Sequence, residues 1–571
     1  MRKLILIIAG VVVVAVVGVF FALNHFLNSE TIIGAASEYL SVHHQRTLTV
    51  KGEVKTSLFP KIGVAIPSVQ ISYPNATATQ FSVDEVSVSV GFMELLSGKI
   101  RVEDVVVTGL DATIRDEDLP STPEGAQKAA STEAPQLPDL RVKSIAITKS
   151  SVRLLDKAKK VKAEVSDLNI VTGSVSKTGS TPLTVSATFK DGSGLVANGK
   201  LTGTLDYDLA KGHIAVNGAK LDVKEAKDEW TLTGSVPEII YDNGAIASRD
   251  LKLAATAAPS VKADVALKAL SLKNNLWSAN NLSVSGTYEN SLVLTLAGSL
   301  SGRADTPTLT PTTLKGTLRN TATGSKVFPV SLRTSFDGKV VKVSNLNIGF
   351  TQGTNSANAT YNVSGAMNAK ANLASVSIQE VSSLFTKQTL VDGPVTGTVN
   401  LASADASDAQ KLTGNFDAKI IKGTLSGISV SRIRKALTLK SFDGLSFDKN
   451  DKTTFNEIKA KGTLKRMVLD VNPIIANDNN IATTGRAVVD INKQTVDAKL
   501  DNKVIVDSKA KTSLSVPVAI KGKLEDPSVT IDMATLLASY VKLTVKTGAA
   551  TPGNILNNAK DSIKSLKGLF K

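Results

Sequence analysis

LTVSATF at residues 183–189 and LTGTLDY at residues 201–207 are the segments that decide the fold. In both, apolar side chains fall on every second residue: Leu183, Val185 and Phe189, then Leu201, Leu205 and Tyr207. Successive side chains of a β-strand point to opposite faces, so this spacing predicts strands that bury one face only.

The same period recurs along the chain, as Val86, Val88 and Val90 (EVSVSV), as Leu292, Leu294 and Leu296 (LVLTL), and within residues 261–267 and 341–348. With 571 residues the chain is too long for one compact core, and only 4% of its residues are aromatic. Extension by repetition of pleated, half-buried strands fits both facts. We therefore predict a mainly β protein, a long curled antiparallel sheet with a few short helices.

A short Gly-x-Leu element repeats, beginning at Gly298, Gly316, Gly423, Gly462 and Gly522, and lysine precedes the glycine in the last four. A glycine inside a strand permits a bend or a close approach of two backbones, so its repetition is one way to curl a sheet. Ordinary turn chemistry is the alternative explanation.

Residues 4–23 (LILIIAGVVVVAVVGVFFAL) contain no charged side chain. About 20 helical residues cross the ~30 Å hydrocarbon core of a bilayer. We therefore predict a transmembrane anchor that includes Leu4, Ile8, Val12, Val16, Phe20 and Leu23. A cleaved signal peptide would have a shorter apolar run and a small-residue cleavage site, whereas bulky residues follow here. Arg2 and Lys3 predict a cytoplasmic N-terminus, with the body on the far side of the membrane.

Composition changes along the chain predict six segments. They are residues 1–28 (cytoplasmic tip and anchor), 29–118 (first strands with a short helix), 119–140 (a Pro/Ala/Ser-rich disordered loop), 141–410 (central repeats), 411–545 (a C-terminal β region) and 546–571 (a linker and basic helix). Breaks in the strand pattern fall at residues 302–311 and 403–410, and short helical inserts are expected at 376–385 and 429–437.

The last segment predicts an amphipathic helix over residues 554–571, with Ile555, Ile563, Leu566 and Phe570 on one face and lysines on the rest. Such a helix can lie on an anionic membrane surface or cap the end of a sheet. The sequence leaves both roles open.

The net charge of +15 attracts anionic surfaces, either phospholipid headgroups or nucleic acid. Its lysines are scattered and lack the clustered arginines and stacking aromatics of a nucleic-acid binder, so no nucleic-acid partner is expected. The four histidines (His25, His43, His44 and His213) show no metal-binding spacing, and cysteine is absent. Nucleophile-elbow and nucleotide-binding motifs are also missing. We expect no catalytic residue, metal or cofactor, and hence no enzyme.

Three stretches resemble the AsmA family of bacterial envelope proteins. They are Ala35–Ser72, Leu95–Ile114 (LLSGKIRVEDVVVTGLDATI) and Gly414–Leu537, which contains the Pro-Val-x-Ile-x-Gly-x-Leu-x-x-Pro step at residues 517–527. Two features depart from the family pattern, namely Gln45-Arg46 where Gly-Arg is usual, and the Pro-rich segment 119–140.

The resemblance implies a repeating β-groove anchored in the bacterial inner membrane, with its body in the periplasm. It implies that the protein carries phospholipids toward the outer membrane and supports outer-membrane biogenesis, with a protein partner in the outer membrane or periplasm at the C-terminal end. The alternative is a scaffold or quality-control factor that affects outer-membrane protein assembly without carrying lipid. The expected groove lining consists of Val86, Val88, Val90, Leu183, Val185, Phe189, Leu201, Leu205, Tyr207, Leu292, Leu294 and Leu296.

Overall fold

The computed structural model describes residues 37, 47–57, 61–72, 81–91, 102–115 and 141–546. The last range has gaps at 157–159, 177, 193, 209–210, 228, 243, 258–259, 305, 307, 388, 407, 440, 443–444, 449 and 508–511. The predicted anchor, the Pro-rich segment 119–140 and the basic segment 554–571 lie outside the described residues. Among the helices of the described ranges, none is both long enough and apolar enough to cross a bilayer.

The chain divides into two compact units, Met1–Val284 and Ser285–Lys571. The strands of the first unit are β1 (Thr47–Val50), β2 (Lys55–Ser57), β3 (Ile62–Ser72), β4 (Phe81–Val90), β5 (Val102–Thr108), β6 (Asp111–Arg115), β7 (Val142–Leu155), β8 (Val161–Thr172), β9 (Thr178–Asp191), β10 (Val196–Asp208), β11 (His213–Glu225), β12 (Trp230–Asp242), β13 (Ala245–Ala257) and β14 (Val261–Lys273). Strand β15 (Leu276–Tyr288) contains the boundary between the units.

The strands of the second unit are β16 (Leu292–Arg303), β17 (Thr308–Asn320), β18 (Phe328–Phe336), β19 (Val340–Ile348), β20 (Thr354–Asn362), β21 (Met367–Ser377), β22 (Val391–Asp392), β23 (Pro394–Ser403), β24 (Leu412–Ser426), β25 (Lys452–Lys465), β26 (Val468–Asn477), β27 (Ile481–Asp490), β28 (Thr495–Asp507), β29 (Thr512–Lys523) and β30 (Asp526–Ile531). Its helices are α4 (Ile378–Ser383), the 3-10 helix η3 (Ala409–Lys411), α5 (Val430–Leu439) and α6 (Met533–Lys546).

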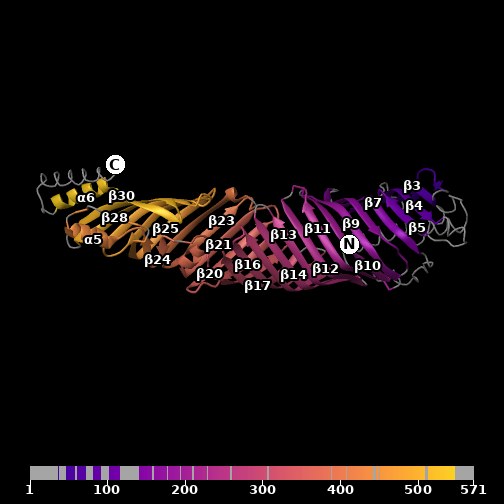
Figure 1. Cartoon of the computed structure of the whole chain (residues 1–571), viewed down its shortest axis with the longest axis horizontal. Coiled ribbons are helices and arrows are strands. Elements are labelled where there is room, and N and C mark those ends of the chain that lie inside the picture. Colours follow the sequence, from indigo (N-terminus) through magenta and orange to yellow (C-terminus); the bar gives the residue numbers. More distant parts are fainter. Residues whose placement is uncertain are drawn as a thin grey trace. The chain divides into compact units, whose positions relative to one another are not determined.

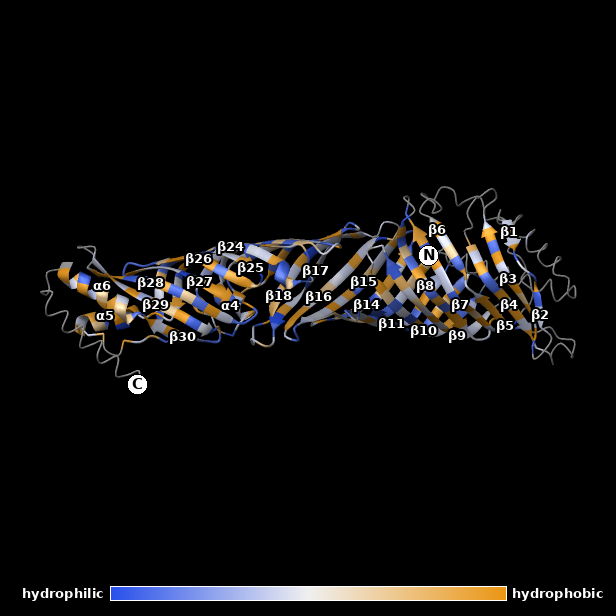
Figure 2. Cartoon of the chain, turned by 90° about the horizontal axis from the view of Figure 1, so that it is seen from above, coloured by the Kyte–Doolittle hydropathy of each residue, from blue (hydrophilic) through white to orange (hydrophobic). Residues whose placement is uncertain are grey.

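The described residues therefore form thirty strands of one sheet with three short α-helices, which confirms the predicted mainly β, antiparallel fold. Within each unit, most strands pair with the next strand in the sequence (Figure 1). Alternation of apolar and polar residues along single strands is visible as orange and blue bands in Figure 2. The helical inserts predicted near 376–385 and 429–437 are α4 and α5.

The predicted break at residues 302–311 is too wide, because β16 continues to Arg303 and β17 begins at Thr308. Pro311 therefore lies inside a strand. The register of β17 against β18 shifts between Leu309 and Thr312. An irregular position of this kind accommodates proline, which has no N–H for the ladder.

One step departs from the antiparallel order. Strands β5 and β6 both pair with β7 in parallel, with Val105 opposite Ile145 and Ala112 opposite Val152. On this step Asp104 accepts hydrogen bonds from Ser144 Oγ on β7 (2.7 Å) and from Ser89 Oγ on β4 (3.2 Å). Partial burial opposes ionisation of Asp104, but bonds from Lys61, Ser144 and Ser89 outweigh it and hold its pKa below the ordinary value.

Most glycines of the repeated element occupy crowded positions. A Cβ at Gly316 would lie 1.8 Å from Thr295 O, and one at Gly462 would lie 2.3 Å from Phe416 Cε1. Such contacts are far closer than a side chain tolerates. These positions therefore need glycine, because the paired strand comes too close to leave room for a Cβ. Gly522 differs, because its φ of 115° places it in the region that favours glycine for its backbone.

Helix α6 covers the last edge of the second unit's sheet. Strand β30 pairs only with the Val518–Lys523 part of β29. Along the rest of β29, Ser515 N donates to Ser539 Oγ of α6 (2.8 Å), and Asp532 N donates to Pro517 O (3.1 Å). These bonds occupy backbone groups that would otherwise present a pairing edge to another chain.

Candidate functional site

Cross-strand register gathers the apolar residues of the first unit on one face of the sheet. Residues directly opposite one another on paired strands project to the same face. One such row crosses six strands, β9 to β14, and consists of Val185, Leu201, Leu221, Gly234, Leu253 and Val265. The next row along the same strands lies on the opposite face and consists of Thr184, Thr202, Lys220, Ser235, Lys252 and Ala266. We call the two surfaces the apolar face and the polar face.

The second unit has the same division. A single apolar row crosses ten strands from β19 to β29, and consists of Val343, Ala359, Ala369, Leu401, Gly414, Leu464, Leu469, Val489, Val496 and Gly522. No charged side chain occurs in it. The sequence shows the alternation of apolar and polar residues within each strand. Strand pairing aligns the apolar positions of neighbouring strands, so that they form a continuous surface.

The twelve residues predicted as groove lining lie on strands but differ in exposure. Val86, Val88 and Val90 of β4 are buried, with Val105 and Val107 of β5 opposite two of them. Leu183 and Tyr207 are also buried. The half-buried members are Val185, Leu201, Leu205, Leu292, Leu294 and Leu296. Phe189 is 41% exposed at the end of β9. The half-buried leucines, Val185 and Phe189 are the members that offer apolar surface without being enclosed by the chain's own side chains.

Two rims bound the sheet of the second unit. The connections at residues 321–327, 349–353, 378–393 and 427–451 join strands at one end and include α4 and α5; we call this the helix rim. The connections at residues 337–339, 363–366 and 404–411 join strands at the other end; we call this the turn rim. The sequence predicts the two helical inserts of the helix rim. It does not predict that they lie at the same end of the strands, because this depends on strand pairing.

Helix α4 is fixed to the helix rim by a buried carboxylate. Glu380 accepts hydrogen bonds from Thr351 N (2.8 Å) and Thr351 Oγ1 (2.6 Å), and Lys326 Nζ lies 3.4 Å away. Burial opposes ionisation of Glu380, but the Thr351 bonds and the Lys326 ammonium outweigh it and lower its pKa. Asn320 Nδ2 also donates to Leu384 O (2.9 Å). The helix is thus tied to two neighbouring turns.

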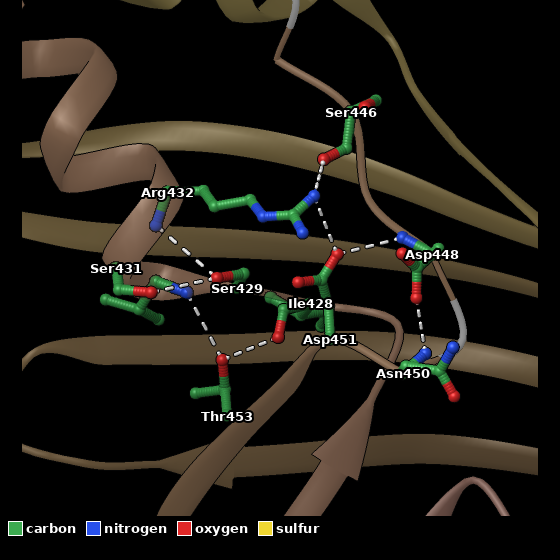
Figure 3. A network of polar contacts seen from close by, with 10 residues as sticks. Ile428, Ser429, Ser431, Arg432, Ser446, Asp448, Asn450, Asp451 and Thr453 are labelled. Atoms are coloured by element: carbon green, nitrogen blue, oxygen red, sulfur yellow. Dashed lines mark hydrogen bonds and ion pairs between the residues drawn. The ribbon is translucent and has the colours of Figure 1, made fainter.

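Helix α5 is fixed by a second polar network, shown in Figure 3. Arg432 Nη1 donates to Ser446 O (2.9 Å) and pairs with Asp451 Oδ2 (3.2 Å). Thr453 Oγ1 donates to Ile428 O (2.8 Å), at the entry to the helix. These bonds fix the position of the helix. Its own residue Ile433 is fully buried.

Near the C-terminal end the protein's own side chains cover the apolar face. Leu514, Val516, Val518 and Ile520 of β29 are all at most 2% exposed. They belong to one cluster with Ile433 of α5 and Leu536 of α6, both at 0%. A polar pair is enclosed there too, since Thr483 Oγ1 lies 2.7 Å from Asn502 Oδ1 and Asn502 Nδ2 donates to Val516 O (3.0 Å). This part of the face is a filled core.

A hollow of about 700 Å³ crosses β19 to β24. Five consecutive members of the apolar row line it, namely Val343, Ala359, Ala369, Leu401 and Gly414. The residues next to them on each strand also contribute, among them Asn358, Asn368, Asn400 and Asn415. In the part of the chain that the structure describes, no three His, Cys, Asp or Glu side chains gather as metal ligands.

A model of the AsmA family matches residues 1–296, just over half of the 571-residue chain. The stretch from 414 to 537, where the sequence also resembles that family, lies beyond the match. No curated protein and no solved structure matches the chain.

Proposed function

Because this chain belongs to the AsmA family, we propose that it carries phospholipids along its apolar face toward the outer membrane of a bacterial envelope. The N-terminal segment would anchor it in the inner membrane, with residues 1–3 in the cytoplasm and the body in the periplasm. Outer-membrane biogenesis would depend on this transport. The role requires no bond to be made or broken, so we assign no catalytic residue and no cofactor.

The observation that carries the proposal is the registered apolar face. Leu201 and Leu205 remain half-buried although they belong to it, and Leu294 is half-buried opposite Leu318 of β17. Each buried methylene group contributes about 0.8 kcal/mol, so an acyl chain laid on such residues gains free energy from contact. Incomplete enclosure keeps this gain moderate, which suits a guest that has to leave again.

The test is lipid mass spectrometry on the full chain after gentle isolation. We expect phospholipid with the wild-type protein and much less with Leu205→Asp plus Leu294→Asp, since a carboxylate repels acyl chains from the face. The matched control is Thr204→Asp plus Val293→Asp, which places the same charges on the polar face of the same strands. Val88 is unsuitable for this purpose because it is 6% exposed in a buried cluster, where a charge would unfold the protein.

Circular dichroism checks that every variant is folded. Absence of phospholipid from the wild-type protein would overturn the proposal, as would equal lipid content in the two pairs of variants. The scaffold alternative predicts that cells carrying folded Leu205→Asp plus Leu294→Asp assemble their outer membrane normally.

A further inference from the structure

Burial on the apolar face of the second unit is graded along several strands. In β18, Phe328 and Val330 next to the helix rim are 2% and 3% exposed, whereas Leu332 and Phe336 toward the turn rim are half-buried. The same gradient occurs in β23 and β24. In β23, Val395 is 2% exposed but Val399 and Leu401 are half-buried, and in β24 Ile420 is 6% exposed but Phe416 is half-buried.

The helix-rim half is filled by the protein itself. Phe328 and Phe350 meet edge to face with ring centroids 5.1 Å apart. Leu384, which follows α4, is 4% exposed, and Val376 at the end of β21 has no exposed surface. Because the protein's own side chains already occupy the face near the helices on β18, β21, β23 and β24, an acyl chain has room on these strands only in the other half.

The turn rim presents exposed apolar residues beside that open half. Tyr361, at the end of β20, is paired with Val341 and Met367 on the apolar face and is 42% exposed. Val363, in the following turn, is 62% exposed, and its N–H donates to Lys339 O (2.9 Å). Exposed apolar side chains at Tyr361 and Val363 next to Lys339 fit a phospholipid. Its acyl chain can cross the apolar surface while its phosphate stays in water near the lysine.

We propose that acyl chains enter and leave the second unit over the turn rim, past Tyr361 and Val363, and lie only on the turn-rim half of the apolar face. This rests on the proposed function. A path that leaves the sheet at its far end is blocked, because the apolar face of β29 is a filled core.

The test places a photo-crosslinking amino acid at single positions of the full chain in cells and measures phospholipid adducts after irradiation. Val363 at the turn rim and Val327 at the helix rim form a matched pair, since both are exposed valines in connections, at 62% and 55%. Leu401 reports the open half and Val516 the filled end. We expect adducts at Leu401 and Val363 to exceed those at Val327 and Val516 several-fold.

The outcomes separate the two proposals. Two results would overturn the turn-rim route while lipid carriage stands, provided that Leu401 forms adducts. One is an equal yield at Val363 and Val327, and the other is a strong adduct at Val516. Absence of adducts at all four positions would count against lipid carriage itself. A second measurement uses Val363→Asp against Val327→Asp, and we expect only the first to lower the lipid content of the isolated protein.

Discussion

Phe442 and Tyr540 meet with ring centroids 5.0 Å apart and planes inclined at 76°. The contact joins the segment after α5 to α6, and therefore links the two helices that cover the end of the sheet. Phe442 belongs to the cluster that fills the apolar face there, and Tyr540 packs against this cluster. Edge-to-face pairs contribute about 0.5–1.5 kcal/mol beyond the area that they bury.

Phe442→Ala should destabilise the second unit by about 3–5 kcal/mol, because it removes a buried ring and leaves a cavity. Urea unfolding together with amide exchange of residues 533–546 measures the loss. Phe385→Ala is the control, since Phe385 is 70% exposed and its removal should change stability by less than about 0.5 kcal/mol. Equal effects of the two substitutions would show that the aromatic contact does not hold the helices.

Glu380→Gln should weaken the attachment of α4 in a pH-dependent way. The folded pKa of Glu380 lies below its unfolded value of about 4.3, so the ionised carboxylate stabilises the fold. This contribution is complete above the unfolded pKa and is lost as pH falls through the folded pKa. The melting temperatures of wild type and variant should therefore differ at pH 7 and converge toward pH 3. A difference that is the same at both pH values would contradict the assignment.

Gly316→Ala should destabilise the second unit by about 1–3 kcal/mol, because its methyl group would strike the backbone oxygen of Thr295. Gly199 is the control. It also lies in a strand, but the nearest atom to an added Cβ is Val223 Cγ2 at 3.8 Å. Thermal unfolding should show little change for Gly199→Ala. If both variants lost the same stability, close approach would not explain the glycine at position 316.

Asp532→Ala should loosen α6 and uncover the edge of β29. Asp532 accepts hydrogen bonds from Thr535 N (3.1 Å) and Thr535 Oγ1 (2.7 Å), which caps the helix and lowers the pKa of its carboxyl. Losing such a cap costs about 0.5–2 kcal/mol. Exchange of the Ser515 amide should become faster, and chromatography should detect association through the freed edge.

The control for the edge is Asp417→Ala, which removes an exposed ion pair with Lys461 on the sheet surface. Exposed pairs contribute at most about 1 kcal/mol, and this one covers no edge. Association by both variants to the same extent would mean that α6 does not protect β29.

Period-two patterning predicted the strands at Val86–Val90, 183–189 and 201–207, because burial of one face imposes it on each strand separately. Strand direction has no such local signal, so the parallel pairing of β7 with β5 and β6 could not be predicted. Helix α6 was also missed, although Asp532 and Thr535 form a cap and Leu536, Tyr540 and Leu543 follow at helical spacing. Its segment was assigned to the C-terminal β region.

For the candidate site, the sequence identified apolar positions but not how open they are. Val88 and Leu205 look alike in sequence, yet the first is enclosed by strands β3 to β7 and the second stays half-buried. Exposure depends on which side chains arrive from distant parts of the chain. The helix rim shows this most clearly, since Phe350 from one connection packs against Phe328 of β18, and the sequence of β18 does not indicate this contact.

The parallel step at β7 has a consequence for folding. Elsewhere most strands pair with the next one in the chain, so few long loops must close, and such contacts form quickly. Strand β7 instead has to dock beside β5 and β6 after a long connection before β8 finds its neighbour. We therefore expect residues 47–115 to acquire amide protection in a separate stage from β8 to β14. Pulse-labelled exchange during refolding measures this, and simultaneous protection of both regions would rule it out.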